Sequence, residues 1–255
     1  MGVRMSTHRP AHARRSTLLA VSLLATLSML AACQDPAAQA QAQAAVQAEA
    51  NEAAAGQAAA DFDAAYAAEN WVLAGAQGDV LLARWPDTAA AERIRPLHEE
   101  VRTKANAARE AARLNALWAY NTEAVKGGNQ LAAAIFSREG VDSDGSGARP
   151  VRLIFRDHPS WGRSSYLVMQ AGDFDCYGAC RVSVTVDDAA PVRMAANRPD
   201  TDEAIAMFID DERALWRMID GAKRLTVDYP VKAGGTRTAV FEVGGLERKR
   251  LPDWN

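Results

Sequence analysis

The chain has 255 residues, three of them Cys, with 29 Lys and Arg against 32 Asp and Glu and a formal net charge of −3 at pH 7. This length can bury a sizeable hydrophobic core in one or two domains. Nucleic-acid-binding proteins usually carry a clustered basic surface, and the slightly acidic balance gives no such footprint, so we expect no nucleic-acid partner.

The first 32 residues have the three parts of a secretory signal peptide. Residues 1–17 are polar and basic, residues 18–30 form a short apolar run, and small residues precede Cys33. The run is shorter than the about 20 apolar residues that a transmembrane helix needs. The sequence Leu30-Ala31-Ala32-Cys33 resembles a bacterial lipobox. The resemblance implies a diacylglycerol on the Cys33 thiol, cleavage before this residue and acylation of the new amino group; a plain signal peptide is the alternative.

Lipidation of Cys33 would make the lipid bilayer a partner of the protein and would fix its location at a membrane. Several acyl chains on one residue give stable anchoring in a lipid bilayer. Because Gln34 rather than Asp follows the cysteine, analogy with enterobacterial sorting favours the outer membrane, facing the periplasm, over the inner membrane. Removal of residues 1–32 takes away four Arg and leaves 25 basic against 32 acidic residues, a net charge of −7.

The next 80 residues lack the alternation typical of strands. Residues 33–60 are mostly Ala and Gln with no apolar stripe, which predicts a solvated tether, in part helical. Apolar side chains recur at helical spacing over residues 61–114, so we expect an antiparallel helical hairpin there. Its first helix should break near the glycines of residues 75–78, and Asp87 or Thr88 should cap the second.

From about residue 115 the apolar period falls to two, which predicts an antiparallel β domain over residues 115–250. Along one predicted strand, for example, Leu153 and Phe155 alternate with Arg152 and Arg156. A short helix should begin after Asp210 or Asp211 and end at Gly221. The expected strands are residues 117–125, 130–137, 151–155, 164–170, 182–186, 191–195, 204–209, 225–229 and 239–243. The sequence therefore predicts an α+β fold with a mostly antiparallel, sandwich-like sheet and one short helix on it.

Cys176 and Cys180 are the two cysteines outside the lipobox. The periplasm is oxidising, so such a pair indicates first a disulfide. A redox-active pair usually has two intervening residues and not three. A zinc site usually has four ligands. Besides the two cysteines, only His98 and His158 remain after the leader, and they lie on different segments, so a zinc site is the less favoured alternative.

No motif in the sequence carries a catalytic constellation, so we predict no catalytic residue, no metal site and no cofactor. Residues 142–147 resemble the start of a calcium loop but lack the acidic residue at position twelve. His158 and Trp161, which we expect to be exposed in a turn between two strands, together with Tyr166, are candidates for a contact patch. A cell-wall-directed hydrolase that uses the His158 turn is the alternative function.

Residues 115–246 are similar to small exported bacterial proteins of the type VI secretion accessory (VasI-like) and invasion-associated locus B kinds. The shared elements include Cys176 with Cys180, the segment Phe208-Ile209-Asp210-Asp211 and the segment Phe241-Glu242-Val243-Gly244-Gly245-Leu246. The resemblance implies a non-enzymatic β domain of the cell envelope. We therefore expect a membrane-anchored binding or scaffold module whose partner is an envelope protein or a cell-wall component.

Overall fold

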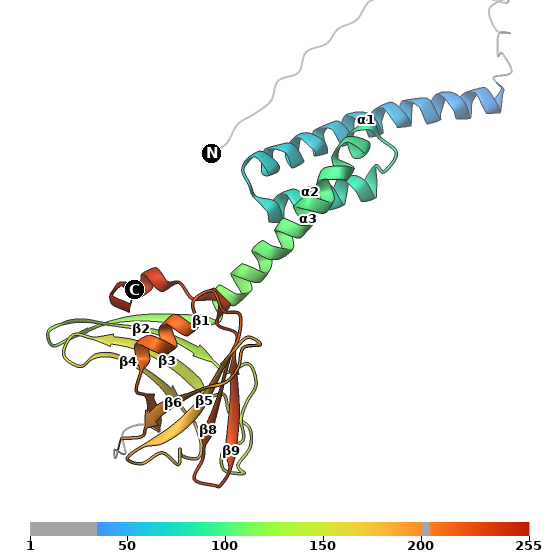
Figure 1. The fold of residues 1–255 in the computed structure, drawn as a ribbon. Coiled ribbons are helices and arrows are strands. Elements are labelled where there is room, and N and C mark those ends of the chain that lie inside the picture. Colours follow the sequence, from blue (N-terminus) through green and yellow to red (C-terminus); the bar gives the residue numbers. More distant parts are fainter. Residues whose placement is uncertain (1–34, 200–204, 255) are drawn as a thin grey trace, which may run out of the picture. The chain divides into compact units, whose positions relative to one another are not determined.

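The computed structural model describes residues 35–199 and 205–254, and its helices and strands are shown in Figure 1. The chain divides into two compact units, residues 1–54 and residues 55–255. The predicted leader and Cys33 lie outside the described residues, as does Ala204, at the start of one predicted strand.

The described part of the first unit is helical. It belongs to α1 (Pro36–Ala67), and its side chains from residue 36 to residue 50 are all exposed. Alanine has the highest helix propensity, which accounts for a helix without a buried face in this segment. A solvated tether, in part helical, was expected over residues 33–60. The helix, however, is continuous, and it runs past the boundary expected at residue 60.

The helical part of the second unit contains three helices where a hairpin of two was expected. The end of α1 packs with α2 (Trp71–Arg84) and α3 (Ala89–Ala116) around a small core that includes Phe62, Leu81 and Ile94. Thr88 caps α3 as predicted, because its Oγ1 accepts a hydrogen bond of 3.3 Å from the Ala91 N–H.

The helix break predicted at residues 75–78 is wrong. Instead, α1 ends at Ala67 and α2 begins at Trp71. Asn70 caps α2, because its side chain accepts a hydrogen bond from the Leu73 N–H at 3.2 Å. Gly75 and Gly78 are buried within α2, and a Cβ atom on Gly78 would lie 2.5 Å from Cδ2 of His98. These glycines therefore allow close approach of α2 to α3 and do not end a helix.

Nine strands of the described residues form one antiparallel sheet in the order β1-β2-β3-β4-β7-β6-β5-β8-β9. The strands are β1 (Trp118–Val125), β2 (Gly128–Phe136), β3 (Arg152–His158), β4 (Gly162–Val168), β5 (Cys180–Val186), β6 (Val192–Asn197), β7 (Ala206–Ile209), β8 (Leu225–Pro230) and β9 (Thr236–Phe241). Each corresponds to a predicted strand with shifted ends, so the α+β fold class is confirmed.

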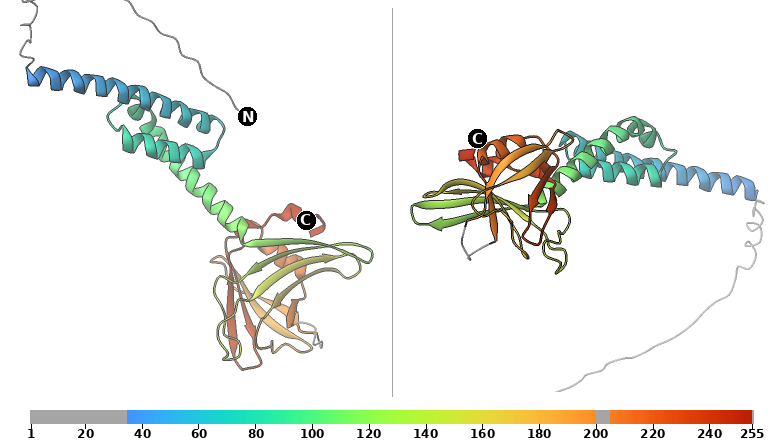
Figure 2. Two further views of the ribbon diagram at one scale, coloured as in Figure 1. Left: turned by 180° about the vertical axis from the view of Figure 1, so that it is seen from behind. Right: turned by 60° about the horizontal axis from the view of Figure 1, so that its bottom comes forward.

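The sheet curls strongly, as Figure 2 shows from two further directions. A backbone hydrogen bond of 2.7 Å from the Arg138 N–H, just after β2, to the carbonyl oxygen of Val240 in β9 connects segments from opposite ends of the strand order. Curling encloses one face of the sheet, and this face supplies most of the core of the β domain.

The core also includes residues of α4 (Glu212–Met218) and of the C-terminal turns η1 (Val243–Gly245) and η3 (Pro252–Trp254), whereas the turn between them, η2 (Arg248–Arg250), has no buried residue. The Trp216 ring of α4 is fully buried, with its centroid 5.1 Å from that of Phe155 and 5.0 Å from that of Trp254. Asp211 caps α4 as predicted, because its Oδ1 accepts a hydrogen bond of 2.9 Å from the Ala214 N–H.

Candidate functional site: an arginine–aromatic face

The outer face of the sheet is defined by the alternation along β3. Leu153 and Phe155 point into the core, so Arg152, Ile154 and Arg156 lie on the opposite side. Neighbouring strands and the β3–β4 turn add large side chains to this outer surface. We call it the arginine–aromatic face and define it by Phe136, Arg152, Ile154, Arg156, Trp161, Tyr166 and Phe208.

Strand register explains why these residues meet. Phe136 of β2 pairs directly with Arg152 of β3. In the next outward-facing row, Ile154 pairs with Tyr166 of β4, which pairs with Phe208 of β7. Directly opposite residues in antiparallel strands have Cβ atoms about 5 Å apart, close enough for these long side chains to touch.

Each arginine of the face lies against an aromatic ring. The Arg152 guanidinium carbon is 5.6 Å from the Phe136 ring centroid. The Arg156 guanidinium carbon is 5.4 Å from the centroids of both Trp161 and Tyr166. Contact with aromatic faces leaves the N–H groups at the edge of a guanidinium available for hydrogen bonds. Arg156 is therefore held in place by two rings without losing its capacity to bind an anion.

Neither arginine has a carboxylate partner within the described parts of the chain. No ion pair within 4.0 Å involves Arg152 or Arg156 in residues 35–199 and 205–254, and the Nε atom of each is buried without a hydrogen-bond partner there. If the pairing of β4 with β7 is continued by one residue, Asp210 lies opposite Ser164. Its carboxylate accepts a hydrogen bond from Asn197 and forms no ion pair with either arginine. Burial raises the pKa of Tyr166, and the Arg156 and Arg152 charges and a hydrogen bond from Arg156 to the Tyr166 hydroxyl oppose this effect.

The predicted contact patch is brought together only in part. Trp161 is 71% exposed, and the Arg156 guanidinium lies against both its ring and the ring of Tyr166. His158, however, is only 7% exposed. The expectation that the His158 side chain is exposed is therefore wrong. The His158 ring stacks under Trp161 with centroids 3.9 Å apart, so it supports the patch from below.

The hydrogen bonds of His158 bear on the hydrolase alternative. Its Nδ1 accepts the N–H groups of Ser160 at 3.1 Å and Trp161 at 3.2 Å. A neutral imidazole has one protonated nitrogen, so these bonds assign the proton to Nε2. In that form Nε2 has no lone pair with which to act as a general base. This geometry assigns His158 to the structure of the turn.

The predicted disulfide between Cys176 and Cys180 is present. Next to it, the Asp173 carboxylate accepts hydrogen bonds from Arg198 Nε at 2.5 Å and from the Tyr177 hydroxyl at 2.9 Å, and it lies 2.9 Å from Lys232 Nζ. Burial alone would raise the pKa of Asp173, but the bonds from Lys232, Arg198 and Tyr177 outweigh it and lower the pKa.

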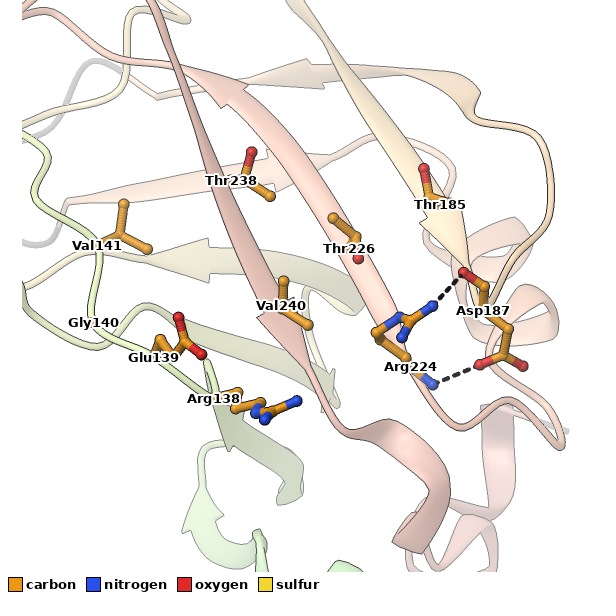
Figure 3. A pocket seen from close by; sticks show the side chains of 10 residues that line it. All are labelled: Arg138, Glu139, Gly140, Val141, Thr185, Asp187, Arg224, Thr226, Thr238 and Val240. Atoms are coloured by element: carbon orange, nitrogen blue, oxygen red, sulfur yellow. Dashed lines mark hydrogen bonds between the residues drawn. The ribbon is translucent and has the colours of Figure 1, made fainter.

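A polar groove of about 530 Å³ lies on the outer side of β5, β8 and β9. Figure 3 shows Thr226 between the two ends of this groove, with Arg138 at one end and Arg224 at the other. Arg224 already donates hydrogen bonds to the Asp187 carbonyl oxygen at 3.0 Å and to Asp188 Oδ1 at 2.8 Å. The groove thus resembles other ligand sites in volume, but one of its two cations is neutralised within the chain.

The remaining sequence candidates have structural roles or lie outside the described residues. Asp142 Oδ1 accepts the N–H groups of Asp144 and Gly145, which shapes the calcium-like loop as a turn. Residues 35–199 and 205–254 contain no group of three or more His, Cys, Asp or Glu that could hold a metal ion. In the same residues, no helix combines the length and the apolar character that crossing a bilayer requires.

Sequence reasoning missed Arg152, Arg156, Phe136 and Phe208 as members of the face. The alternation along β3 placed the two arginines on the same side of a strand, and this was the only feature of the sequence that pointed to them as a pair. The strand order that places Phe136 and Phe208 beside them was not contained in that pattern. Comparisons of the chain with protein-family models, with curated proteins and with solved structures gave no match.

Proposed function

We propose that the protein is a lipid-anchored, non-enzymatic binding module of the bacterial envelope. It is attached through acylated Cys33, faces the periplasm from the outer membrane, and binds an envelope partner with the arginine–aromatic face of its β domain. The observation that carries this proposal is the pair Arg152 and Arg156, two cations held against aromatic rings with no carboxylate partner among the described residues.

Three features of the sequence and fold support the anchoring half of the proposal. The lipobox-like segment ends at Cys33, and residues 36–50 form an exposed Ala/Gln-rich part of α1. A helix of residues 36–54 has a length of about 28 Å at about 1.5 Å per residue. Such a segment suits a spacer, because its side chains up to residue 50 are all exposed.

The composition of the face supports the binding half. Trp, Tyr and Arg are the residues most enriched at the energetic centres of protein interfaces. Neither guanidinium charge has a carboxylate partner among the described residues, so an acidic group supplied by a ligand would be favourable. The partner we propose is accordingly one that brings acidic groups to this face.

Membrane fractionation tests the anchor. The full-length protein should sediment with outer membranes, and the Cys33→Ser variant should be recovered in the soluble periplasmic fraction. A matched Ser22→Ala variant, in the apolar run of the leader, should fractionate like the wild type. Sedimentation of the Cys33→Ser variant with outer membranes would contradict lipid anchoring.

In-cell crosslinking tests the binding surface separately. A photo-crosslinking amino acid in place of Trp161 should capture one envelope component, and the additional replacements Arg152→Ala and Arg156→Ala should abolish the product. Arg181→Ala with Arg193→Ala is the matched control, because both side chains are exposed on other strands of the sheet. An equal product in the two double variants would exclude the arginine–aromatic face as the binding surface.

A further inference from the structure

We infer that the arginine–aromatic face binds an extended acidic segment of a protein, with two carboxylates four residues apart and an apolar side chain midway between them. This inference rests on the proposed function and makes it specific, because it names the chemistry and the spacing of the partner. The predicted pattern is acidic-x-apolar-x-acidic.

The spacing follows from β3 itself. Arg152 and Arg156 lie on the same side of one strand, four residues apart. At about 3.3 Å per residue their Cα atoms are about 13 Å apart. An extended peptide lying along β3 has the same rise, so side chains at positions i and i+4 on its facing side repeat at the same distance. Two carboxylates at these positions can each approach one guanidinium.

The centre of the face is apolar. Ile154 lies between the two arginines in sequence and is 9% exposed, and Ala134 of β2, its partner in the register, is 3% exposed. Because both of these side chains are buried, the accessible apolar surface of the row comes from the partly exposed rings of Tyr166 in β4 and Phe208 in β7, whose centroids are 4.9 Å apart. The side chain at position i+2 of the bound peptide would face this row, so we expect it to be apolar.

The charges of the face favour a peptide over a neutral glycan. Trp161 is 71% exposed, and its ring lies against the His158 ring and the Arg156 guanidinium. Two guanidinium groups beside apolar surface match carboxylates and an aliphatic side chain, because charge-assisted hydrogen bonds to carboxylates are stronger than those to neutral groups.

Charge complementarity supports an acidic partner and limits which acidic partners bind. The chain as a whole is slightly acidic, with 29 basic against 32 acidic residues. An acidic segment is therefore attracted by the two local arginines and not by the average charge of the protein. We expect selectivity for the position of the acidic groups and not for their number.

Fluorescence anisotropy with labelled peptides tests the inference on the mature chain with Cys33→Ser. The probe is Gly-Glu-Ser-Leu-Ser-Glu-Gly. The comparison peptides are Gly-Glu-Glu-Leu-Ser-Ser-Gly, which has the same composition with adjacent acids, and Gly-Gln-Ser-Leu-Ser-Gln-Gly, which has no charge. The probe should bind about tenfold or more tighter than either comparison peptide.

Variants of the protein assign that binding to the two arginines. Arg152→Ala and Arg156→Ala should each reduce affinity for the probe to the level of the comparison peptides. Arg181→Ala with Arg193→Ala should leave it unchanged. Arg156→Lys keeps the charge but loses the planar fork, so it should retain part of the affinity. Circular dichroism melting curves confirm that each variant is folded.

Three results would overturn the inference. The first is equal affinity for the spaced and the adjacent acidic peptides. The second is tighter binding of inorganic polyphosphate than of the spaced peptide. The third is an affinity for the spaced peptide that neither Arg152→Ala nor Arg156→Ala changes. If the peptides fail in this way but crosslinking from position 161 still depends on Arg152 and Arg156, the proposed function stands and the acidic-peptide inference is rejected. If crosslinking is also independent of both arginines, the face itself is rejected.

Discussion

Gly245 of η1 packs directly against the backbone of Leu114 near the end of α3. A Cβ atom on Gly245 would lie 2.2 Å from the carbonyl carbon of Leu114 and 2.3 Å from the backbone nitrogen of Asn115. Backbone atoms cannot rotate away as a flexible side chain can, so this position excludes any side chain. Asn115 Nδ2 adds hydrogen bonds to the Gly245 carbonyl oxygen at 3.3 Å and to Glu247 Oε1 at 2.7 Å.

We therefore expect Gly245→Ala to lower the free energy of unfolding by roughly 2 kcal/mol or more, because the added methyl group forces the backbone apart. Thermal melting followed by circular dichroism measures the effect. Gly56→Ala is the control, since a Cβ atom there meets nothing within 4 Å and the residue lies in α1. The control should raise stability by about 0.5–1 kcal/mol. A Gly245→Ala melting temperature equal to that of the wild type would show that the backbone at this contact has room for a methyl group.

The two tryptophans at positions 161 and 216 should respond in opposite ways to replacement by alanine. Trp216 is fully buried, so Trp216→Ala should cost about 3–5 kcal/mol of stability. Trp161 is 71% exposed, so Trp161→Ala should change stability by no more than about 0.5 kcal/mol. The same Trp161→Ala variant should weaken binding of the spaced acidic peptide, because Arg156 loses one of its two rings. Melting curves and peptide anisotropy on the same preparations separate the two effects, and strong destabilisation by Trp161→Ala would contradict its peripheral position.

Asp173 should make the β domain sensitive to acid. Its pKa is lowered in the folded state, so its contribution to stability is present above the unfolded-state pKa of about 3.9 and is lost as the pH falls through the folded-state pKa. Asp173→Asn leaves Arg198, whose side chain is 5% exposed, without this carboxylate. At pH 7 the variant should be less stable by about 3 kcal/mol.

Urea unfolding of the wild type and Asp173→Asn between pH 2 and pH 7 tests this prediction. The difference between the two proteins should shrink as the pH falls below about 4. Asp188→Asn is the control, because the Asp188 side chain is 96% exposed in its ion pair with Arg224, and exposed pairs contribute little. A difference that is independent of pH would mean that Asp173 acts through packing and not through its charge.

The disulfide should be stable during purification and modest in its effect. With Cys33→Ser, denatured and unreduced protein should show no free thiol, and reduction should release the two thiols of Cys176 and Cys180. The bridge closes a short loop, so its loss should cost about 2 kcal/mol. Thiol titration and melting with and without reductant measure both quantities. Two free thiols in the unreduced protein would exclude the bridge.

Much of the β domain was determined by local sequence. Alternation of apolar and polar residues located all nine described strands, because side chains of a strand point to opposite faces with a period of two. The caps Thr88 and Asp211 were each one of two adjacent candidates, because an oxygen-bearing side chain before a helix satisfies a free backbone N–H. The disulfide was predicted because two cysteines remain outside the lipobox-like segment and an oxidising compartment was expected.

Local sequence was less informative in the helical part. Gly75 and Gly78 suggested a helix break, because glycine has low helix propensity. Their actual role, close contact of α2 with α3 at His98, depends on which helices are neighbours. A preference of about 1 kcal/mol per residue is readily outweighed by tertiary packing.

The arginine–aromatic face was decided by the tertiary structure. The sequence alone placed Arg152 and Arg156 on one side of a strand, and it marked Trp161 and Tyr166 as candidates. Phe136 and Phe208 come from β2 and β7, which reach β3 and β4 through pairings between residues far apart in the chain. The contact of Gly245 with Leu114 also joins residues far apart in the chain, here a C-terminal turn and the end of α3. A local pattern sets the side of a strand on which a residue lies, whereas its neighbours across strands are set by the order in which the whole sheet buries its core.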